Sequence, residues 1–468
     1  MGRGHGEVLS MVDAMFVRLE TPTEHMHTAG LFVFDPAPDG DFDFYGFLDL
    51  IHSRLHLVPR FRQKLAFPPL KLANPTWIDD EQFDISYHVR HATLPSPGRI
   101  DQLLDYVERL VSRPLDRDHP LWELYVIEGL EEGRVAYFAK THHAMIDGIT
   151  GIDIATLLLD FHEQVGAIPP PKPWVPSPRP SDLLLAWSAV QEQLLTARGV
   201  LEGAQRFVRA PGRVAGRGLR VGRGLLSVAA GIAPGPDSPL NRPIGTSRRF
   251  AVQRLPLADV KAVKETSGTT VNDVVLAIVG DATGRFLRER GDETRGLELK
   301  VMVPVSMRSD DERLVFGNRV SSLFVRLPVY EMDPVDRLMR VHADMRHVKE
   351  SGHAVGADFL ISLSAYAPPT LIALAARLAS RTRLHNFVVT NVPGPQATLY
   401  SLGMRLLGAF PLLPLVQNHS YAVGVTSLDG WLNFGFTADA DTFPDLENVT
   451  GALADALGEL VKATAASR

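Results

Sequence analysis

The stretch AKTHHAMIDGITG, residues 139–151, places two adjacent histidines shortly before an Asp-Gly pair. The histidines are His142 and His143, and the pair is Asp147-Gly148. An imidazole has an ordinary pKa of about 6.5, so it can take up and return a proton at neutral pH. A neighbouring carboxylate can fix the tautomer of the ring, and a glycine lets the backbone turn tightly. The stretch therefore indicates a candidate base, which would suit the deprotonation of an alcohol or amine that attacks a thioester.

Two other interpretations of the histidine pair are a packed pair in the core and a metal site. A metal site needs three or four well-placed nitrogen, oxygen or sulfur ligands. Adjacent side chains on a strand point to opposite faces, and no nearby cluster of histidines and carboxylates completes a ligand set. We therefore favour the catalytic base and predict no metal site.

Strands and helices are predicted to alternate along both halves of the chain. Aromatic and β-branched runs favour strands, and apolar residues at helical spacing favour helices. The expected strands cover residues 28–35, 134–140, 248–257, 299–307, 320–329, 386–395 and both arms of a hairpin at 420–439 that turns at Asp429-Gly430. The expected helices cover 101–111, 149–161, 181–209, 272–290, 334–351, 358–381 and 443–463. The double histidine would then lie between a buried strand and a helix.

Proline-rich stretches divide the chain into three parts. IPPPKPWVPSPRP (168–180) and APGPDSPLNRP (233–243) can hold neither a regular helix nor a central strand. We expect an N-terminal half with the double histidine at residues 1–165, a Pro/Arg-rich crossover segment at 166–245 and a C-terminal half at 246–468. The alternation of strands and helices makes each half α/β or α+β.

Composition narrows the classes of function. The 468 residues exceed the size of one ordinary core, and the net charge of −6 argues against a nucleic-acid partner. The absence of cysteine excludes disulfides, thiolate metal ligands and a cysteine-bound acyl intermediate. We find neither a signal-peptide pattern nor a long uncharged apolar run, so a cytoplasmic protein without a spanning helix is expected. No pattern in the sequence indicates an oligomeric state.

Several stretches together resemble a known family. HHAMIDG (142–148) matches the HHxxxDG motif of CoA-dependent acyltransferases, which include chloramphenicol acetyltransferase, carnitine acyltransferases and the condensation domains of peptide synthetases. The other stretches are LSMVDAMFVRLETPTEHMHTAGLFVFD (9–35), HPLWELYVIEGL (119–130), VNDVVLAIVGDATGRFL (271–287) and NVPGP (391–395). In order and spacing they resemble bacterial wax ester synthase/diacylglycerol acyltransferases, from about residue 9 to residue 450.

The resemblance implies an activity and roles for the motif residues. The activity is the transfer of a long-chain fatty acyl group from acyl-CoA to diacylglycerol, giving triacylglycerol, or to fatty alcohols, giving wax esters. His143 would be the general base, with His142 and Asp147 supporting it and Gly148 shaping the turn. Asp147 would pair with an arginine, for which Arg308 is one candidate. Acyl-CoA would be a co-substrate, and no further cofactor is implied.

The resemblance also implies a fold and a place for the substrates. It predicts two chloramphenicol-acetyltransferase-like halves, each a mixed sheet with helices, and a substrate tunnel at their interface. We expect Trp122, Asn272, Asp273 and Asn391 to line this tunnel. Each has another interpretation: packing for Trp122, a helix N-cap for Asn272 or Asp273, and a rigid turn for Asn391.

The crossover segment suggests how the protein meets its lipid substrates. Residues 198–223 carry seven arginines among leucines and valines. Such a segment can meet anionic headgroups at a membrane or lipid-droplet surface, steer the phosphates of CoA, or remain a solvated connection.

Two alternative functions of the protein also stay open. One is acyl transfer to another hydroxyl or amine, such as that of a polyketide, and the other is lipid binding without catalysis.

Overall fold

The computed structural model describes residues 7–37, 42–69, 74–145, 157–164, 166, 173–181, 183–185, 187, 234–306, 320–350 and 383–466. The expected helix at 358–381 and the arginine-bearing segment 198–223 lie outside these residues. So does most of the helix expected at 149–161, and the helix expected at 181–209 is described only up to residue 187.

One six-stranded sheet is built mainly from the N-terminal half, with the strand order β12-β13-β2-β7-β6-β5. The strands are β2 (His27–Phe34), β5 (Val89–Thr93), β6 (Trp122–Glu128), β7 (Val135–His142), β12 (Tyr400–Ser401) and β13 (Met404–Leu412). Only β5 and β6 run parallel, and the other neighbours are antiparallel. The sheet is therefore mixed, as predicted.

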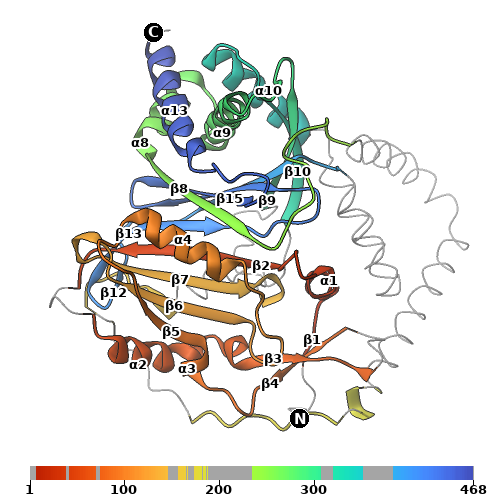
Figure 1. Cartoon of the computed structure of the whole chain (residues 1–468), viewed down its shortest axis with the longest axis vertical. Coiled ribbons are helices and arrows are strands. Elements are labelled where there is room, and N and C mark those ends of the chain that lie inside the picture. The colour runs from red at the N-terminus through yellow and green to blue at the C-terminus, as the bar shows by residue number, and fades with distance from the viewer. Residues whose placement is uncertain are drawn as a thin grey trace, which may run out of the picture.

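In the described part of the chain, helices and a small second sheet accompany this sheet. They are α1 (Met11–Leu19), α2 (Phe44–Arg54), α3 (Ile85–His88), α4 (Ile100–Val111) and a small sheet of β1 (Glu7–Val8), β4 (Thr76–Asp79) and β3 (Gln63–Ala66). Figure 1 shows α2 and α3 on the outer side of the sheet and α4 between the two large sheets. The apolar stripe of α4 fits this position, because Leu103, Val107 and Leu110 are all buried.

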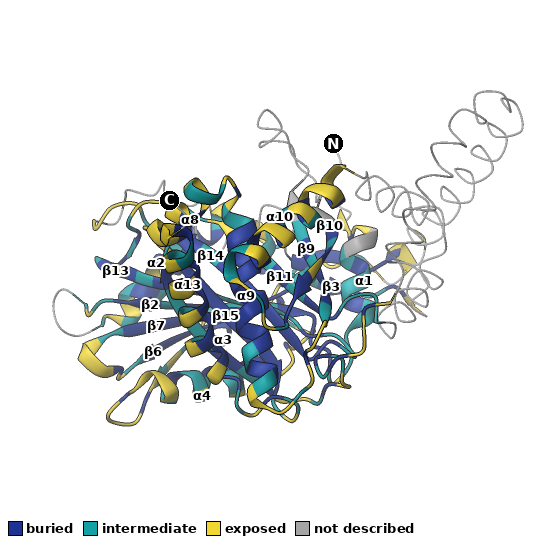
Figure 2. Cartoon of the chain, turned by 90° about the horizontal axis from the view of Figure 1, so that it is seen from above, coloured by how far each residue is buried: buried dark blue, intermediate teal, exposed yellow. Residues whose placement is uncertain are grey.

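The second six-stranded sheet belongs to the C-terminal half, with the order β10-β9-β11-β14-β15-β8. Its strands are β8 (Arg248–Pro256), β9 (Glu298–Ser306), β10 (Val320–Pro328), β11 (Phe387–Pro393), β14 (Tyr421–Leu428) and β15 (Trp431–Asp439). Its helices are α8 (Leu257–Ser267), α9 (Val271–Glu289), α10 (Pro334–Glu350) and α13 (Asn448–Ala466), which cover the face turned away from the first sheet (Figure 1). Figure 2 shows the strands largely buried and the exposed residues on outer helices such as α10.

The predicted hairpin is confirmed, while the start of the last helix differs. Asp429 and Gly430 have φ values of 44° and 78°, the left-handed values that a two-residue turn between β14 and β15 requires. Helix α13 begins at Asn448 rather than near residue 443. The Asp439 carboxylate accepts hydrogen bonds from both the backbone N–H and the hydroxyl of Thr442, and Phe443 is fully buried. These contacts hold a turn where apolar spacing suggested helix.

The strand β13 is the main departure from the expected division into halves. It follows β11 in the C-terminal half, yet it pairs with β2 and extends the first sheet. No strand was expected there, although alternate residues of β13 are buried. The two halves are therefore joined by main-chain hydrogen bonds as well as by side-chain packing.

Two paired glycines allow the sheets to approach closely at β13. Gly424 on β14 and Gly435 on β15 lie opposite each other, next to Pro411 of β13. A Cβ atom at Gly435 would lie only 1.9 Å from the carbonyl oxygen of Pro411, and one at Gly424 would lie 2.8 Å from its ring. Only glycine fits these two positions without moving β13.

Replacing Gly435 with alanine should lower the free energy of unfolding by about 1–3 kcal/mol, because the new methyl group overlaps the Pro411 carbonyl. Thermal unfolding of the purified protein measures the change. Gly458→Ala on α13 is the matched control, since nothing lies within 4 Å of the added methyl group and alanine favours a helix. Equal melting temperatures for Gly435→Ala and the wild type would contradict the close approach.

Candidate active site

The double histidine lies where a buried strand ends and a short turn begins. His142 is the last residue of β7 and pairs with His27 of β2, and His143 starts the turn η5 (His143–Met145). The backbone N–H of His143 donates to the carbonyl of Met26 at 2.7 Å, which fixes the start of the turn. The expected end of a buried strand at this motif is confirmed.

His142 stabilises the turn through one of its ring nitrogens. It is 1% exposed, and its Nδ1 accepts a hydrogen bond from the backbone N–H of Ala144 at 3.0 Å. Because Nδ1 is an acceptor, the proton of the neutral ring is on Nε2. Burial, and to a smaller extent the positive charge of Arg117, lower the pKa of His142 to about 3. His142 is therefore neutral, with one nitrogen already engaged in holding the turn.

Glu20 is the carboxylate nearest to His142, but an arginine already pairs with it. Glu20 Oε2 lies 3.7 Å from His142 Nε2, which is too long for a hydrogen bond. The Nε of Arg117 donates to the same oxygen at 2.9 Å. The carboxylate therefore neutralises Arg117 rather than charging His142.

The ring of His143, unlike that of His142, makes no hydrogen bond to a described residue of the turn. It is half-buried, and its Nδ1 has no hydrogen-bond partner among the residues that the structure describes. Its ring stacks on Phe16 of α1, with 3.9 Å between the ring centroids and an interplanar angle of 26°. Burial lowers the pKa of His143 below its ordinary value. A neutral imidazole at pH 7 is the form that can accept a proton.

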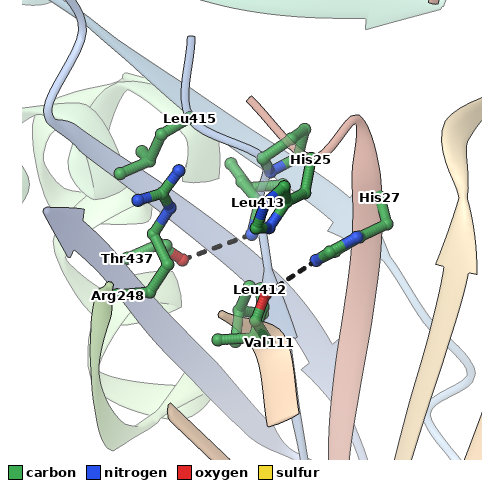
Figure 3. Close-up of a pocket in the computed structure, with 9 residues that line it drawn as sticks. His25, His27, Val111, Arg248, Leu412, Leu413, Leu415 and Thr437 are labelled. Carbon is green, nitrogen blue, oxygen red and sulfur yellow. Dashed lines mark hydrogen bonds between the residues drawn. The ribbon is translucent and has the colours of Figure 1, made fainter. Parts of the chain in front are cut away.

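A small polar pocket lies where the two halves meet, close to the start of β2 (Figure 3). His25 and His27 face Arg248 of β8 and Thr437 of β15 across it. His27 Nε2 donates to the carbonyl oxygen of Val111 at 2.9 Å, and burial lowers the pKa of His27 well below its ordinary value. The remaining lining residues are Leu412, Leu413, Pro414 and Leu415. This pocket is near the expected interface, and the tunnel itself stays a prediction.

The structure favours packing over channel lining for Trp122. Its indole is 1% exposed, its Nε1 donates to the carbonyl of Phe61 at 2.8 Å, and its ring stacks on His88. These contacts enclose the ring in the core of the first half.

The residues expected on the other side of the tunnel occupy α9 and β11. Thr270, rather than Asn272 or Asp273, is the N-cap of α9, and Asp273 closes the capping box and contacts His342 Nδ1 at 2.8 Å. Asn272 is half-buried in the first turn of this helix. Asn391 lies within strand β11 and not in a turn, which starts only after Pro393.

Asp147, Gly148 and Arg308 lie outside the residues that the structure describes, so their expected roles stay predictions. Within the described residues, no group of three histidines, aspartates or glutamates could hold a metal ion. No helix in the same part of the chain is long and apolar enough to cross a membrane.

Sequence analysis missed three residues that surround the histidines: Phe16, Glu20 and Arg117. Phe16 and Glu20 lie within the stretch at 9–35 that carries the family resemblance, so a signal for this region existed. The sequence does not show that the helix α1, which carries Phe16, contacts the turn η5, because the two are far apart in the chain and meet only through tertiary packing.

Replacing His142 with alanine should lower the free energy of unfolding by about 1–3 kcal/mol, because the N–H of Ala144 loses its acceptor in a buried site. Activity should fall with it. His142→Asn should restore part of the stability, since its amide oxygen can accept the same hydrogen bond. Thermal unfolding provides the measurement, and His52→Ala on the exposed face of α2 is the control. Unchanged stability in His142→Ala would contradict the role of Nδ1.

Comparison with known proteins agrees with this geometry. Residues 9–275 match the model of the wax ester synthase/diacylglycerol acyltransferase catalytic domain, and residues 316–461 match the C-terminal domain of the same family. A probable diacylglycerol O-acyltransferase, tgs1, of Mycobacterium tuberculosis strain H37Rv is 33% identical over 460 residues, covering 97% of this chain and 95% of that protein. A putative diacylglycerol O-acyltransferase of the same strain is 33% identical over 468 residues, covering 97% of this chain and 90% of that protein.

Solved structures give the same result. The wax ester synthase/diacylglycerol acyltransferase from Marinobacter aquaeolei VT8 matches with a TM-score of 0.69 and 27% identity, covering 98% of this chain and all of that one. The starter condensation domain of rhizomide synthetase shares the fold alone, with a TM-score of 0.58 and 13% identity over 98% of this chain and 95% of that one. The predicted resemblance and the fold of two mixed-sheet halves are confirmed, and the chain belongs to the wax ester synthase/diacylglycerol acyltransferase family.

Proposed function

We propose that this acyltransferase moves a long-chain fatty acyl group from acyl-CoA to diacylglycerol, giving triacylglycerol, with His143 as the general base. Fatty alcohols would be a second class of acceptor, giving wax esters. The observation that carries the proposal is the state of His143: its ring is half-buried and neutral, and its Nδ1 has no partner among the described residues. The names of the Mycobacterium tuberculosis relatives favour diacylglycerol as the acceptor.

In the proposed reaction, His143 first acts as a base and then as an acid. The imidazole of His143 takes the hydroxyl proton of the acceptor while the oxygen attacks the thioester carbonyl. The tetrahedral intermediate then collapses, the carbon–sulfur bond breaks, and the imidazolium returns its proton to the CoA thiolate. No acyl-enzyme is needed, which suits a chain without cysteine.

The remaining motif residues would support this base. His142 positions the turn through its Nδ1, and Asp147 would hold the following loop through an arginine such as Arg308. Gly148 would allow the tight turn. Asn272 and Asn391 would face the substrates from the second half, where each is half-buried.

The water-insoluble acceptors call for contact with a lipid surface. We place this contact at the crossover segment, whose arginines at 198–223 would meet anionic headgroups. Exposed apolar side chains precede it: Val175 is 80% exposed, Leu183 is 83% exposed and Trp187 is 60% exposed. Tryptophan and leucine beside arginines are the residues of interfacial membrane binding.

Replacing His143 with alanine should lower the rate of CoA release about 10²–10⁴-fold, because the general base is lost. The assay follows CoA release from palmitoyl-CoA with diacylglycerol, with hexadecanol and with neither. Release by the wild type should require an alcohol, and the better alcohol identifies the preferred acceptor. His52→Ala is the control for a histidine outside the site.

Two results would overturn the proposal. If the wild type releases no CoA with either alcohol, the acceptor is another one, such as a polyketide hydroxyl or amine, or the protein binds lipid without turnover. Full activity of His143→Ala would remove the base assignment.

The pH dependence should follow the lowered pKa of His143. Only the neutral imidazole accepts a proton, and burial favours the neutral form. The rate at saturating substrate should therefore stay level down to pH 6.5 and fall only below it. A pH–rate profile between pH 4.5 and 8.5 tests this, and an acid limb centred above pH 6.5 would contradict it.

A further inference from the structure

The N-terminal helix α1 packs directly on the turn that carries His143. Phe16 contributes its ring face to His143, with a centroid distance of 3.9 Å and an angle of 26°. A cation within about 6 Å of an aromatic centroid is attracted by the electron-rich face of the ring. The stack therefore matters most in the step in which His143 becomes positively charged.

Several contacts hold α1 in place. The side chain of Ser10 caps its first turn by accepting from the N–H of Asp13 at 3.2 Å. At the other end, Arg117 donates to the carbonyl of Val17 and to the carboxylate of Glu20, each at 2.9 Å. Ala14 and Val17 are buried in the core of the first half. These contacts hold the helix that carries Phe16 against the first half.

The charged groups around the turn are otherwise engaged. Glu20 pairs with Arg117, and Arg18 donates to Asn74. Glu24 accepts from the N–H of Gln417. Within the part of the chain that the structure describes, no carboxylate forms an ion pair with His143, and the adjacent His142 has a pKa lowered by burial. Among the described residues, Phe16 is the aromatic side chain that stacks on the ring of His143.

We propose that Phe16 is a positioning residue that holds the ring of His143 and stabilises the imidazolium formed when His143 takes the acceptor proton. This rests on the proposed role of His143 as the base. Burial alone would make His143 a poor proton acceptor, because it penalises the charged ring. The aromatic face offsets part of that penalty without adding a counter-charge that would hold the ring protonated.

The test compares Phe16→Leu, which keeps an apolar side chain but loses the aromatic face, with Phe16→Tyr, which keeps the face. Phe44→Leu is the matched control, because Phe44 forms another phenylalanine–histidine stack, with His91, at 4.6 Å and 8°. The kcat, the KM for palmitoyl-CoA and the pH–rate profile are measured for all variants. The pKa of His143 is also measured by NMR of ring-labelled histidine, with His143→Gln identifying its signal.

Phe16→Leu should lower kcat about 2- to 30-fold at unchanged KM and lower the pKa of His143 by about 0.4 to 1.5 units. The acid limb should move to lower pH by the same amount, since the protonated ring loses its stabilisation. Phe16→Tyr and Phe44→Leu should stay close to wild type.

An unmoved pKa in Phe16→Leu would overturn the proposal, because packing alone could lower kcat without changing the protonation equilibrium. An effect confined to KM, or a tyrosine variant no better than the leucine variant, would overturn it too. The NMR titration needs no turnover. It can therefore support the stack even if His143→Ala shows that another group is the base.

Discussion

The main-chain pairing of β13 with β2 is the constraint on which the rest of the molecule depends. It inserts a strand from the C-terminal half into the first sheet, and it holds Pro411 against the glycine pair of β14 and β15. Strand β2 in turn pairs with β7, whose last residue is His142. The position of the double histidine is therefore set by strands from both halves, and the halves cannot move apart without breaking a sheet.

Burial sets the chemistry of the histidines in this region. It lowers the pKa values of His27, His142 and His143 alike, so all three are neutral. Their roles differ because of hydrogen bonding. Each of the three has one buried ring nitrogen without a partner among the described residues, but His27 uses its other nitrogen to bind the carbonyl of Val111 and His142 uses its other nitrogen to bind the N–H of Ala144. The ring of His143 makes no such bond to a described residue. A neutral and unengaged imidazole is what an acyl transfer from a thioester to an alcohol requires.

The helix α1 contacts both Arg117 and the turn that carries His143. Glu20, the residue that follows the helix, pairs with Arg117, whose positive charge lowers the pKa of His142. Phe16 of the helix contributes an aromatic face at the ring of His143. This short helix is held beside the turn by capping at its start and by hydrogen bonds from Arg117 at its end.

The sequence by itself determined the strands and helices with strong periodicity, the turn at Asp429-Gly430, the end of β7 at the double histidine and the family. These features depend on residues that are neighbours along the chain, so local spacing is enough to reveal them. Only the tertiary structure decided that β13 completes the first sheet, that Trp122 is enclosed by the core, that Thr270 caps α9 and that Phe16 stacks on His143. The partners in these contacts, except at the cap, lie far apart in the sequence. Which helix and sheet faces pack together depends on the total apolar surface that the whole chain buries. A local sequence pattern does not show this total.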